Sequence, residues 1–268
     1  MSKKRLDVLL VERNLTESRE KAKRLIMAGL VYSENHRLDK PGMSVDPNIS
    51  LTIKGNDCPY VSRGGLKLEK ALREFNVSME KKVLLDVGAS TGGFTDCALR
   101  HGAHLSYAID VGYNQLHWKL RNDNRVVVME RTNFRYVTPE MLLKDKPNIA
   151  TIDVSFISLQ LILPVLKNLL VPNSDVIALI KPQFEAGKND VSKGGIVKEP
   201  KIQQQVIEKV ISFAKDEQYQ PLNLTYSPIT GGKGNIEYLV HFGWKKDINA
   251  YQYLDIKQVI NDAHRTLS

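Results

Sequence analysis

The chain has 268 residues, of which 42% are hydrophobic and 25% are charged, a composition typical of folded globular proteins. This length allows a full hydrophobic core and one smaller module, so we expect two domains. The 38 lysines and arginines outnumber the 30 acidic residues, which gives a net charge of +8. That excess favours a polyanionic partner, but charge alone does not distinguish RNA, DNA and an anionic membrane.

Local patterns argue against a disulfide framework, a metal site and a membrane anchor. Cys58 and Cys97 lie far apart without a Cys-x-x-Cys motif, and His101 and His104 flank a glycine at an expected helix end. Charged residues interrupt the apolar run at the N-terminus, unlike in a signal peptide. The most apolar stretch, residues 157–171, contains polar residues and falls short of a membrane span of about 20 residues. We therefore expect a cytoplasmic protein without a metal site.

The first sixty residues predict a small module of helices and strands. Residues 5–13 carry three leucines on one helical face, and residues 16–27 form a second, basic helix with Thr16 as candidate N-cap. Short alternating strands follow as far as Ile53. The charges of this module are either merely solvated or a binding surface. A polar break at residues 55–59 then predicts the junction with the rest of the chain.

The stretch VLLDVGASTGGFTD, residues 83–96, predicts a ligand site. Its first five residues read as a buried strand, and the glycine-rich segment 88–93 as a tight turn into a helix. A dinucleotide uses such a turn, although Ser90 here replaces the middle glycine of its motif. A hydrolase also uses one, with Ser90 as the nucleophile of a Gly-x-Ser-x-Gly motif. The third ligand class is S-adenosylmethionine, whose cationic groups suit an acid such as Asp86.

Strand-like segments recur along the chain with helical stretches between them. This alternation predicts a mostly parallel sheet closed by an antiparallel last strand, preceded by a helix over residues 65–75. Ligands of such sheets bind at the carboxyl ends of the strands. The predicted strands cover residues 83–87, 103–109, 125–129, 148–152, 176–180, 222–226 and 237–242.

Polar residues at two of these strand ends suit a nucleoside. Asp110 lies 24 residues after Asp86, close to the interval of about 20 residues at which an acid meets ribose hydroxyls in nucleoside-binding folds. Glu130 and Asn133 follow the third strand. They suit either an adenine edge or a cap on the next element, and the sequence leaves both readings open.

Charged residues gather at the other strand ends. Asp153 follows the fourth strand and Lys181 the fifth, so we expect both in one partly buried crevice, as catalytic groups or as a plain ion pair. Lys67 lies in the first turn of the helix expected over residues 65–75, where a cation is unfavourable without a negative partner. Residues 183–199 form a polar, glycine-containing segment and are a candidate substrate lid. Glu237 begins the last strand.

The N-terminal module resembles the S4 RNA-binding module. RLDVLL, ESREKAKRLIMAGLVY and a KPG turn carry the resemblance, in the expected order. It implies recognition of phosphate and shape in structured RNA by the basic helix. The residues then expected to contact RNA are Arg5, Arg19, Lys23 and Arg24, together with Arg63 at the junction.

Five further motifs resemble the TlyA-type haemolysin and ribosomal RNA methyltransferase family. They are DVGASTGGFTD, AIDVGYNQL, TIDVSFIS, LIKPQFEAGK and GGKGNIEYL. The linker departs from the family, because DCPYV stands where related chains carry an Arg-x-Trp-Val segment, which leaves any coupling role of that segment open. The resemblance implies a Rossmann-like α/β methyltransferase sheet after a small α+β S4-like domain. The expected divisions are an S4-like domain at 1–58, a linker at 59–64 and an FtsJ-like domain at 65–268.

The family resemblance also implies an activity. It is the transfer of a methyl group from S-adenosylmethionine to a ribose 2′-hydroxyl of ribosomal RNA, usually of cytidine, in the small or large subunit. Its catalytic Lys-Asp-Lys-Glu tetrad falls on Lys67, Asp153, Lys181 and Glu237. The expected partner is ribosomal RNA or a ribosomal subunit, not a membrane. The expected cofactor residues are Asp86, Gly88, Ser90, Thr91, Gly92, Gly93, Phe94, Asp110, Glu130 and Asn133.

A chemical role for the tetrad follows as a hypothesis. Lys181, with a pKa lowered by burial and by the like charge of Lys67, would accept the hydroxyl proton or hold the emerging alkoxide. The two acids would orient the lysines, although their negative charges oppose that lowering. Two alternatives remain: a serine hydrolase using Ser90 with His241, and a membrane-active haemolysin.

Overall fold

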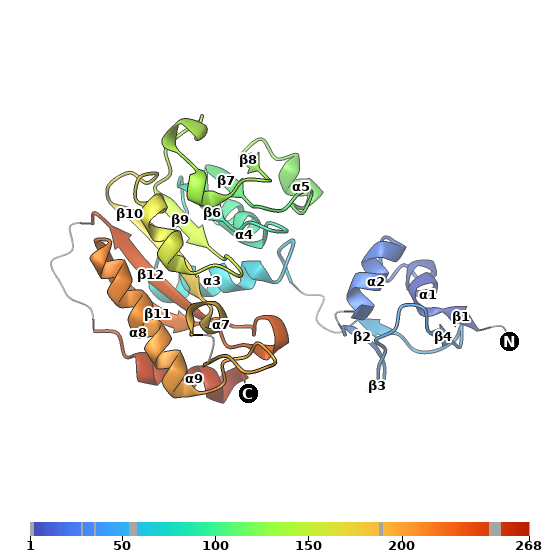
Figure 1. Ribbon diagram of the computed structural model, residues 1–268. Helices are drawn as coiled ribbons and strands as arrows, with labels where there is room; N and C mark the ends of the chain where they lie inside the picture. The colour runs from blue at the N-terminus through green and yellow to red at the C-terminus, as the bar shows by residue number, and fades with distance from the viewer. Residues whose placement is uncertain are drawn as a thin grey trace. The chain divides into compact units, whose positions relative to one another are not determined.

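The computed structural model describes residues 3–27, 29–34, 36–53, 58–187, 190–246 and 253–267. The chain divides into two compact units (Figure 1), Met1–Pro59 and Tyr60–Ser268, and each unit has its own hydrophobic core. The expected linker overlaps the second unit, because Tyr60 is buried there and its hydroxyl donates to Glu69 Oε1 at 2.7 Å. The polar break expected at residues 55–59 falls largely outside the described residues.

The first unit packs two helices against short antiparallel strands. Its core consists mainly of leucines and isoleucine from the two helices, with Val31 and Val45 from the strands. The second helix begins one residue after Ser18, whose Oγ accepts from the backbone N–H of Lys21 at 3.2 Å. Ser18 is therefore the cap in place of Thr16, because only Ser18 lies three residues before that N–H. The elements are β1 Lys4–Arg5, α1 Leu6–Glu12, α2 Arg19–Met27, β2 Val31–Ser33, β3 His36–Arg37, β4 Ser44–Val45 and β5 Thr52–Ile53.

The second unit is built on a seven-stranded sheet with the order β11-β12-β10-β9-β6-β7-β8. Strand β12 lies between β10 and β11 and runs antiparallel to both, while the remaining neighbours are parallel. This confirms the predicted sheet with its antiparallel last strand. The strands are β6 Val83–Val87, β7 Leu105–Ile109, β8 Val126–Met129, β9 Ile149–Ile152, β10 Ser174–Ile180, β11 Tyr219–Tyr226 and β12 Tyr238–Trp244.

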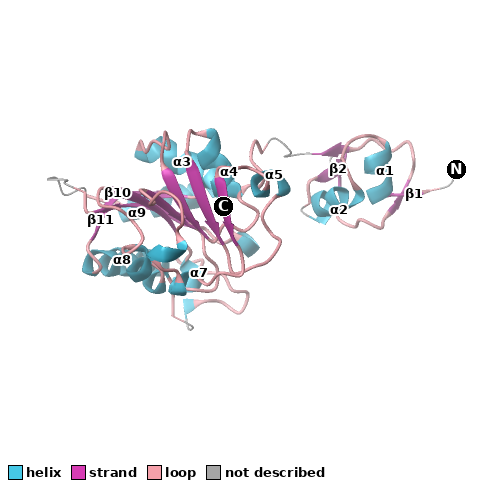
Figure 2. Cartoon of the chain, turned by 90° about the horizontal axis from the view of Figure 1, so that it is seen from above, coloured by secondary structure: helices cyan, strands magenta, loops and turns pink. Residues whose placement is uncertain are grey.

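Helices cover both faces of this sheet (Figure 2). Alternate strand residues such as Leu85, Tyr107 and Ala178 pack with α6, α8 and α9. On the other face, α3 and α4 pack together, and Phe75 of α3 stacks on His241 of β12 at 5.7 Å between ring centroids. The helices are α3 Gly64–Phe75, α4 Gly93–Arg100, α5 Trp118–Arg121, α6 Leu163–Leu166, α7 Pro182–Glu185, α8 Pro200–Asp216 and α9 Ile256–Leu267, with short 3₁₀ helices η1 Phe134–Tyr136, η2 Pro139–Met141, η3 Leu159–Leu161 and η5 Gly232–Gly234.

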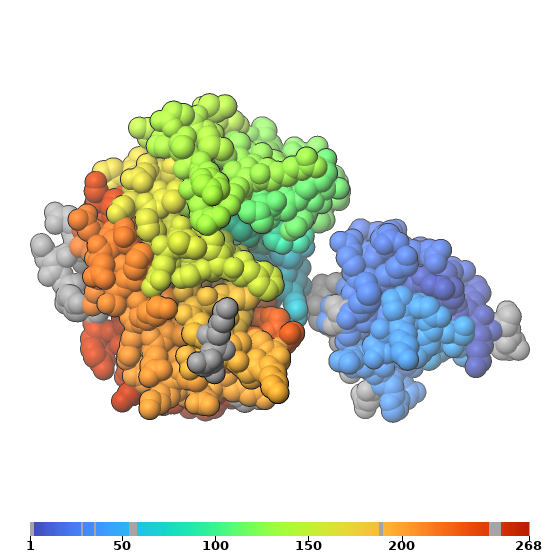
Figure 3. All heavy atoms as spheres, in the orientation of Figure 1, coloured from blue at the N-terminus to red at the C-terminus, as the bar shows by residue number. Residues whose placement is uncertain are grey.

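The topology brings four segments to one edge of the sheet. Strands β6, β9 and β10 end at this edge, and β12 begins there, because Ile180 pairs with Tyr238. The segments after β9 and β10 are also joined: Glu185 accepts hydrogen bonds from Ser158 Oγ at 2.6 Å and from the Leu159 N–H at 2.7 Å. These segments, yellow and orange in Figure 3, lie side by side on the surface of the unit.

Candidate functional site

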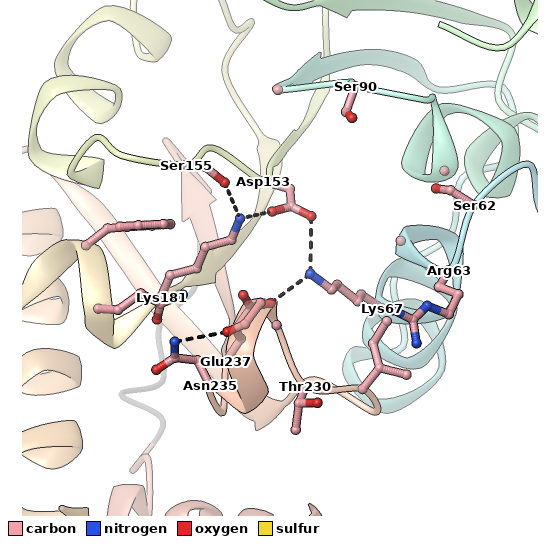
Figure 4. Close-up of a pocket in the computed structure, with 18 of the residues that line it drawn as sticks. Ser62, Arg63, Lys67, Ser90, Asp153, Ser155, Lys181, Thr230, Asn235 and Glu237 are labelled. Carbon is pink, nitrogen blue, oxygen red and sulfur yellow. Dashed lines mark hydrogen bonds and ion pairs between the residues drawn. The ribbon is translucent and has the colours of Figure 1, made fainter. Parts of the chain in front are cut away.

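Four charged side chains form a continuous chain at this edge (Figure 4). Lys181 Nζ lies 2.5 Å from Asp153 Oδ1, and the other carboxylate oxygen of Asp153 lies 3.4 Å from Lys67 Nζ. Lys67 Nζ lies 2.7 Å from Glu237 Oε2. Lys181 also donates to Ser155 Oγ at 3.1 Å. The structure thus brings together the four residues predicted as the tetrad, with cations and anions in alternation.

The local fold explains why these four residues meet. Asp153 and Lys181 directly follow the neighbouring parallel strands β9 and β10, and Glu237 directly precedes the antiparallel strand β12. Lys67 comes from the first turn of α3, which packs on the sheet. Its two carboxylate partners supply the negative charge that a lysine at a helix N-terminus requires.

Burial sets the electrostatics of this group. The side chains of Lys67 and Lys181 are each 9% exposed, and that of Glu237 is 3% exposed. Desolvation alone would lower the pKa of Lys67, but the charges of Asp153 and Glu237 outweigh it and raise that pKa. Desolvation likewise opposes ionisation of Asp153, yet Lys67 and Lys181 hold its pKa below the usual value. Lys67 is therefore a fixed ammonium at neutral pH.

A pocket of about 880 Å³ opens beside the tetrad and is lined by the glycine turn after β6. Its volume falls within the usual range for small-molecule sites, about 300–1,000 Å³. Gly88 has φ +86°, and a Cβ there would lie 2.6 Å from the carbonyl oxygen of Asp153. A Cβ on Gly93 would lie 2.3 Å from Ser62 Oγ. Glycine at these positions lets the turn pack against the backbone of Asp153 and against the start of α3.

Other predicted cofactor residues lie on the same pocket. Ser90, Thr91 and Phe94 line it. Gly92, which opens α4 with φ +95°, lies in the same turn, where a Cβ would meet Leu120 at 2.3 Å. These positions fit the expectation that the turn carries the cofactor.

Asp86 differs from its predicted role. It is fully buried, and its carboxylate accepts from Thr95 Oγ1 at 2.7 Å, from Thr95 N–H at 3.1 Å and from Thr151 Oγ1 at 2.8 Å. Burial raises its pKa to about 6, against these hydrogen bonds. Because both oxygens serve the protein interior, we reassign Asp86 from contact with a cationic ligand to positioning the turn.

Asp110 holds the far side of the turn. Its Oδ2 accepts from the N–H of Ser90 at 2.8 Å, and its Oδ1 accepts from the N–H of Gly112 at 2.7 Å. The carboxylate therefore connects the turn after β6 with the segment after β7. A ribose contact stays a prediction for this residue.

The structure shows what the side chains of Glu130 and Asn133 contact. Glu130 Oε1 accepts from the N–H groups of Gln115 and Leu116 and from Arg121 Nη2 at 2.8 Å. Desolvation would raise the pKa of Glu130, but these donors lower it to about 2. Asn133 accepts from the Arg135 N–H at 3.2 Å and so caps η1. Asn133 therefore caps the next element, whereas Glu130 binds the earlier segment that leads into α5. An adenine contact stays a prediction for both residues.

Several pocket residues were not predicted as site residues. Ser155 belongs to the quoted TIDVSFIS motif, and its position two residues after Asp153 was the signal for it. Asn235 is buried, accepts from the Val197 N–H at 3.1 Å and donates to the Gly195 carbonyl at 2.9 Å. It thereby joins part of the candidate lid to the turn before Glu237. A lid movement stays a prediction, and residues 188–189 lie outside the described residues.

The serine hydrolase alternative does not agree with the geometry. His241, the proposed partner of Ser90, lies inside β12, where its Nε2 is 2.8 Å from Asp175 Oδ1 and its Nδ1 is 3.1 Å from Asn223 Nδ2. Both ring nitrogens are thus occupied within the sheet. Ser90 itself has φ +49° and bonds Asp110 through its backbone N–H.

The predicted RNA contacts lie in two places. In the first unit, Arg5 and Arg19 both pair with the buried Asp7, and Lys23 pairs with Glu20 at 2.8 Å on the surface of α2. Arg24 belongs to the last turn of that helix. In the second unit, the exposed Arg63 lines the pocket beside α3. Asp7 was not predicted to take part.

Comparison with protein families divides the chain as the fold does. The model for the FtsJ-like methyltransferase matches residues 60–244, and that for the S4 domain matches residues 4–48. A 16S/23S rRNA (cytidine-2′-O)-methyltransferase, TlyA of Mycobacterium tuberculosis, is 39% identical over 98% of this chain and 97% of its own. The chain belongs to the TlyA-type methyltransferase family.

Two further relatives of this TlyA-type methyltransferase span nearly the whole chain. YqxC of Bacillus subtilis, named as a candidate rRNA methyltransferase, is 62% identical over 99% of this chain and 95% of its own. A solved structure of a candidate hemolysin from Streptococcus thermophilus is 50% identical, with a TM-score of 0.78 over 99% of this chain and 97% of that one. Family and fold class are therefore confirmed.

The family assignment gives S-adenosylmethionine as the cofactor of the TlyA-type methyltransferase. The glycine turn fits it, because Gly88 and Gly93 line a pocket of suitable size. Among the described residues, no cluster of three His, Cys, Asp or Glu is placed to hold a metal ion. None of the helices in the described residues is long and apolar enough to cross a membrane.

Proposed function

We propose that this enzyme methylates the ribose 2′-hydroxyl of a cytidine in ribosomal RNA, with S-adenosylmethionine as methyl donor. The observation that carries this proposal is the Lys181–Asp153–Lys67–Glu237 chain beside the glycine-lined pocket. A ribose hydroxyl requires a proton acceptor and a charged environment, and this chain offers both. The name of the Mycobacterium tuberculosis relative supports the substrate class.

The bound cofactor would supply an electrophilic methyl group on a sulfonium, so the protein has to orient the hydroxyl and remove its proton. Lys181 is the better proton acceptor of the two lysines, because it faces one carboxylate and a serine hydroxyl. Lys67 lies between two carboxylates and keeps its proton. Loss of a proton from Lys67 would leave two buried anions without their shared cation.

The two acids hold the lysines in place. Asp153 bridges them, with one carboxylate oxygen toward each ammonium. Glu237 holds Lys67 from the other side and is itself almost fully buried. This arrangement limits the movement of the Lys181 amine, and a fixed proton acceptor contributes to catalysis chiefly through orientation. Ser155 adds a hydrogen bond to the same amine.

Different segments of the protein would hold the cofactor and the RNA. The turn at residues 88–93 and Phe94 would hold the cofactor, and Asp86 and Asp110 would keep the turn in shape. The first unit, which contains the S4 domain, carries arginines suited to RNA phosphates. Arg63, at the rim of the pocket, would meet the same polyanion beside the reacting ribose.

The proposal is tested by mapping 2′-O-methyl groups in ribosomal RNA. Ribosomal RNA from cells with the protein, without it, and with the Lys181→Ala variant would be compared at every nucleotide. We expect one or more cytidines to lose 2′-O-methylation in the last two samples. Identical maps from all three samples would refute the proposed function.

A further inference from the structure

A buried carboxylate in the first unit joins two arginines that were predicted to contact RNA. Asp7, at the start of α1, has no exposed surface. Its Oδ1 accepts from Arg5 Nε at 2.9 Å and its Oδ2 from Arg5 Nη2 at 3.1 Å. The same Oδ2 accepts from Arg19 Nη2 at 3.1 Å. One acid therefore connects β1, α1 and α2.

The arginines themselves face solvent. The side chains of Arg5 and Arg19 are 51% and 54% exposed, while Asp7 beneath them is enclosed. A guanidinium carries five N–H donors. Arg5 places two on Asp7 and Arg19 places one, so each retains donors for another acceptor. With two cations and one anion, the cluster still carries a net positive charge.

The pairing with Asp7 holds the two arginine side chains in a fixed orientation before RNA binds. A free arginine side chain loses several rotatable bonds when it binds a phosphate, whereas one already held in a forked pair loses fewer. The Arg5 pair with Asp7 is bidentate, which fixes the plane of the guanidinium as well as its position. A role in folding alone would not require both arginines to keep half of their surface exposed.

We propose that Asp7 is a positioning residue for RNA binding. It holds the guanidinium groups of Arg5 and Arg19 as a pair aimed at backbone phosphate oxygens of structured RNA. The inference rests on the proposed function, because the RNA substrate class comes from there. It adds an acid as a contributor to the binding of a polyanion.

The Asp7→Asn variant tests this role because two mechanisms predict opposite signs. Removal of a carboxylate raises the net charge of the protein by one, so charge alone predicts tighter RNA binding and a steeper salt dependence. Loss of positioning predicts binding weaker by about 5-fold or more. It also predicts a salt slope shallower by about 0.7–0.9 for each lost phosphate contact. The measurement is binding of the full-length protein to unmethylated 16S and 23S rRNA transcripts.

Glu12 provides a matched control in the same unit. It pairs with Lys4 at 2.6 Å on the surface, and both side chains are nearly half exposed. Glu12→Gln makes the same change in charge without touching Arg5 or Arg19, so we expect unchanged or slightly tighter binding. In a chain that already carries Arg5→Gln and Arg19→Gln, Asp7→Asn should cause no further loss, because coupled residues are not additive.

A second variant covers the case in which Asp7→Asn unfolds the first unit. The double variant Arg5→Lys and Arg19→Lys keeps every charge but removes the forked geometry. Positioning predicts weaker binding for it, and charge alone predicts no change. Binding by Asp7→Asn as tight as wild type, or an unchanged double-lysine variant, would overturn the inference. Failure of the wild-type chain to bind either transcript would instead overturn the proposed function.

Discussion

Lys67 lies between two carboxylates, Asp153 and Glu237, whereas Asp7 lies between two guanidinium groups, those of Arg5 and Arg19. In the first cluster the cation is enclosed, and its charge is balanced by the buried Glu237 and the partly buried Asp153. In the second the anion is enclosed and the cations face solvent. We propose that the same type of ion pair serves a reaction in the first cluster, where the side chains are at most 18% exposed, and binding in the second, where the positive partners are about half exposed.

The largest expected effect concerns Lys181, the proposed proton acceptor of the enclosed cluster. Lys181→Ala should lower the methylation rate by about 10²- to 10⁴-fold, the usual contribution of a positioned acid or base. Lys181→Arg keeps the charge but removes the amine proposed to accept the proton, so it should be similarly inactive. Single-turnover methylation across pH 6–10 measures both variants, with cofactor binding followed separately by calorimetry.

A matched control for this variant is Lys257→Ala, because Lys257 is an exposed lysine on α9. It should keep wild-type activity. If Lys181→Arg retained near-wild-type activity, Lys181 would act through its charge and not as a base. If Lys181→Ala did so with normal cofactor binding, its assignment to the reaction would be wrong.

The next effect separates structure from chemistry within the tetrad. Glu237→Ala leaves the buried Lys67 with Asp153 at 3.4 Å as its remaining partner, so we expect a loss of about 3 kcal/mol in the free energy of unfolding, the low end for a broken buried pair. The double variant Lys67→Met and Glu237→Leu should regain most of it while staying inactive. Urea unfolding measures both. An unchanged stability in Glu237→Ala would show that the Lys67–Glu237 pair does not stabilise the fold.

Two buried aspartates, one in each unit, should contribute opposite pH dependence, each in its own pH range. The hydrogen bond with Arg5, and then the pairing with Arg19, holds the pKa of Asp7 down to about 2. Its contribution to stability is therefore full above its unfolded pKa, near 4, and is lost as the pH falls toward 2. Burial instead raises the pKa of Asp86 to about 6, so the second unit loses stability, of the order of 2 kcal/mol, as the pH rises from about 4 to 6.

Hydrogen exchange resolved by segment distinguishes the two units in the full chain. Amides of residues 6–27 should lose protection toward low pH, and Asp7→Asn should remove that part of the slope. Amides of residues 83–109 should lose protection between pH 4 and 6, and Asp86→Asn should flatten the change. Equal slopes in both segments would contradict the assignment of these two carboxylates.

The smallest expected effect is that of Ser90→Ala. The bond that Ser90 gives to Asp110 uses its backbone N–H, which alanine retains. Methylation should therefore stay within a few-fold of wild type, with a modest weakening of cofactor binding measured by calorimetry. An esterase activity that disappears in Ser90→Ala would revive the hydrolase alternative.

The sequence predicted the parts of the site that depend on local pattern. Apolar runs indicated the strands, and polar residues at their ends placed Asp153 and Lys181 in one crevice. Lys67 and Glu237 appeared as isolated charges, and only the family resemblance supplied their partners. Their meeting depends on β12 entering the sheet between β10 and β11, a long-range pairing that no local pattern records.

The sequence also could not show which acids would be free to bind a ligand. Asp86 stands near a strand end, as a cofactor acid would, but Thr95 on the following helix and Thr151 on the neighbouring strand β9 occupy its oxygens. Asp7 looked like one polar residue on an amphipathic helix. Its role becomes visible only once β1 and α2 bring Arg5 and Arg19 to it.

The most direct test is the identity of the methylated atom. Ribosomal subunits from cells lacking the protein would be incubated with purified enzyme and isotope-labelled S-adenosylmethionine, and the RNA digested to nucleosides for mass spectrometry. We predict that the label appears in 2′-O-methylcytidine with wild-type enzyme and is absent with Lys181→Ala. Label on a base atom, or label in 2′-O-methylcytidine that persists with Lys181→Ala, would contradict the account.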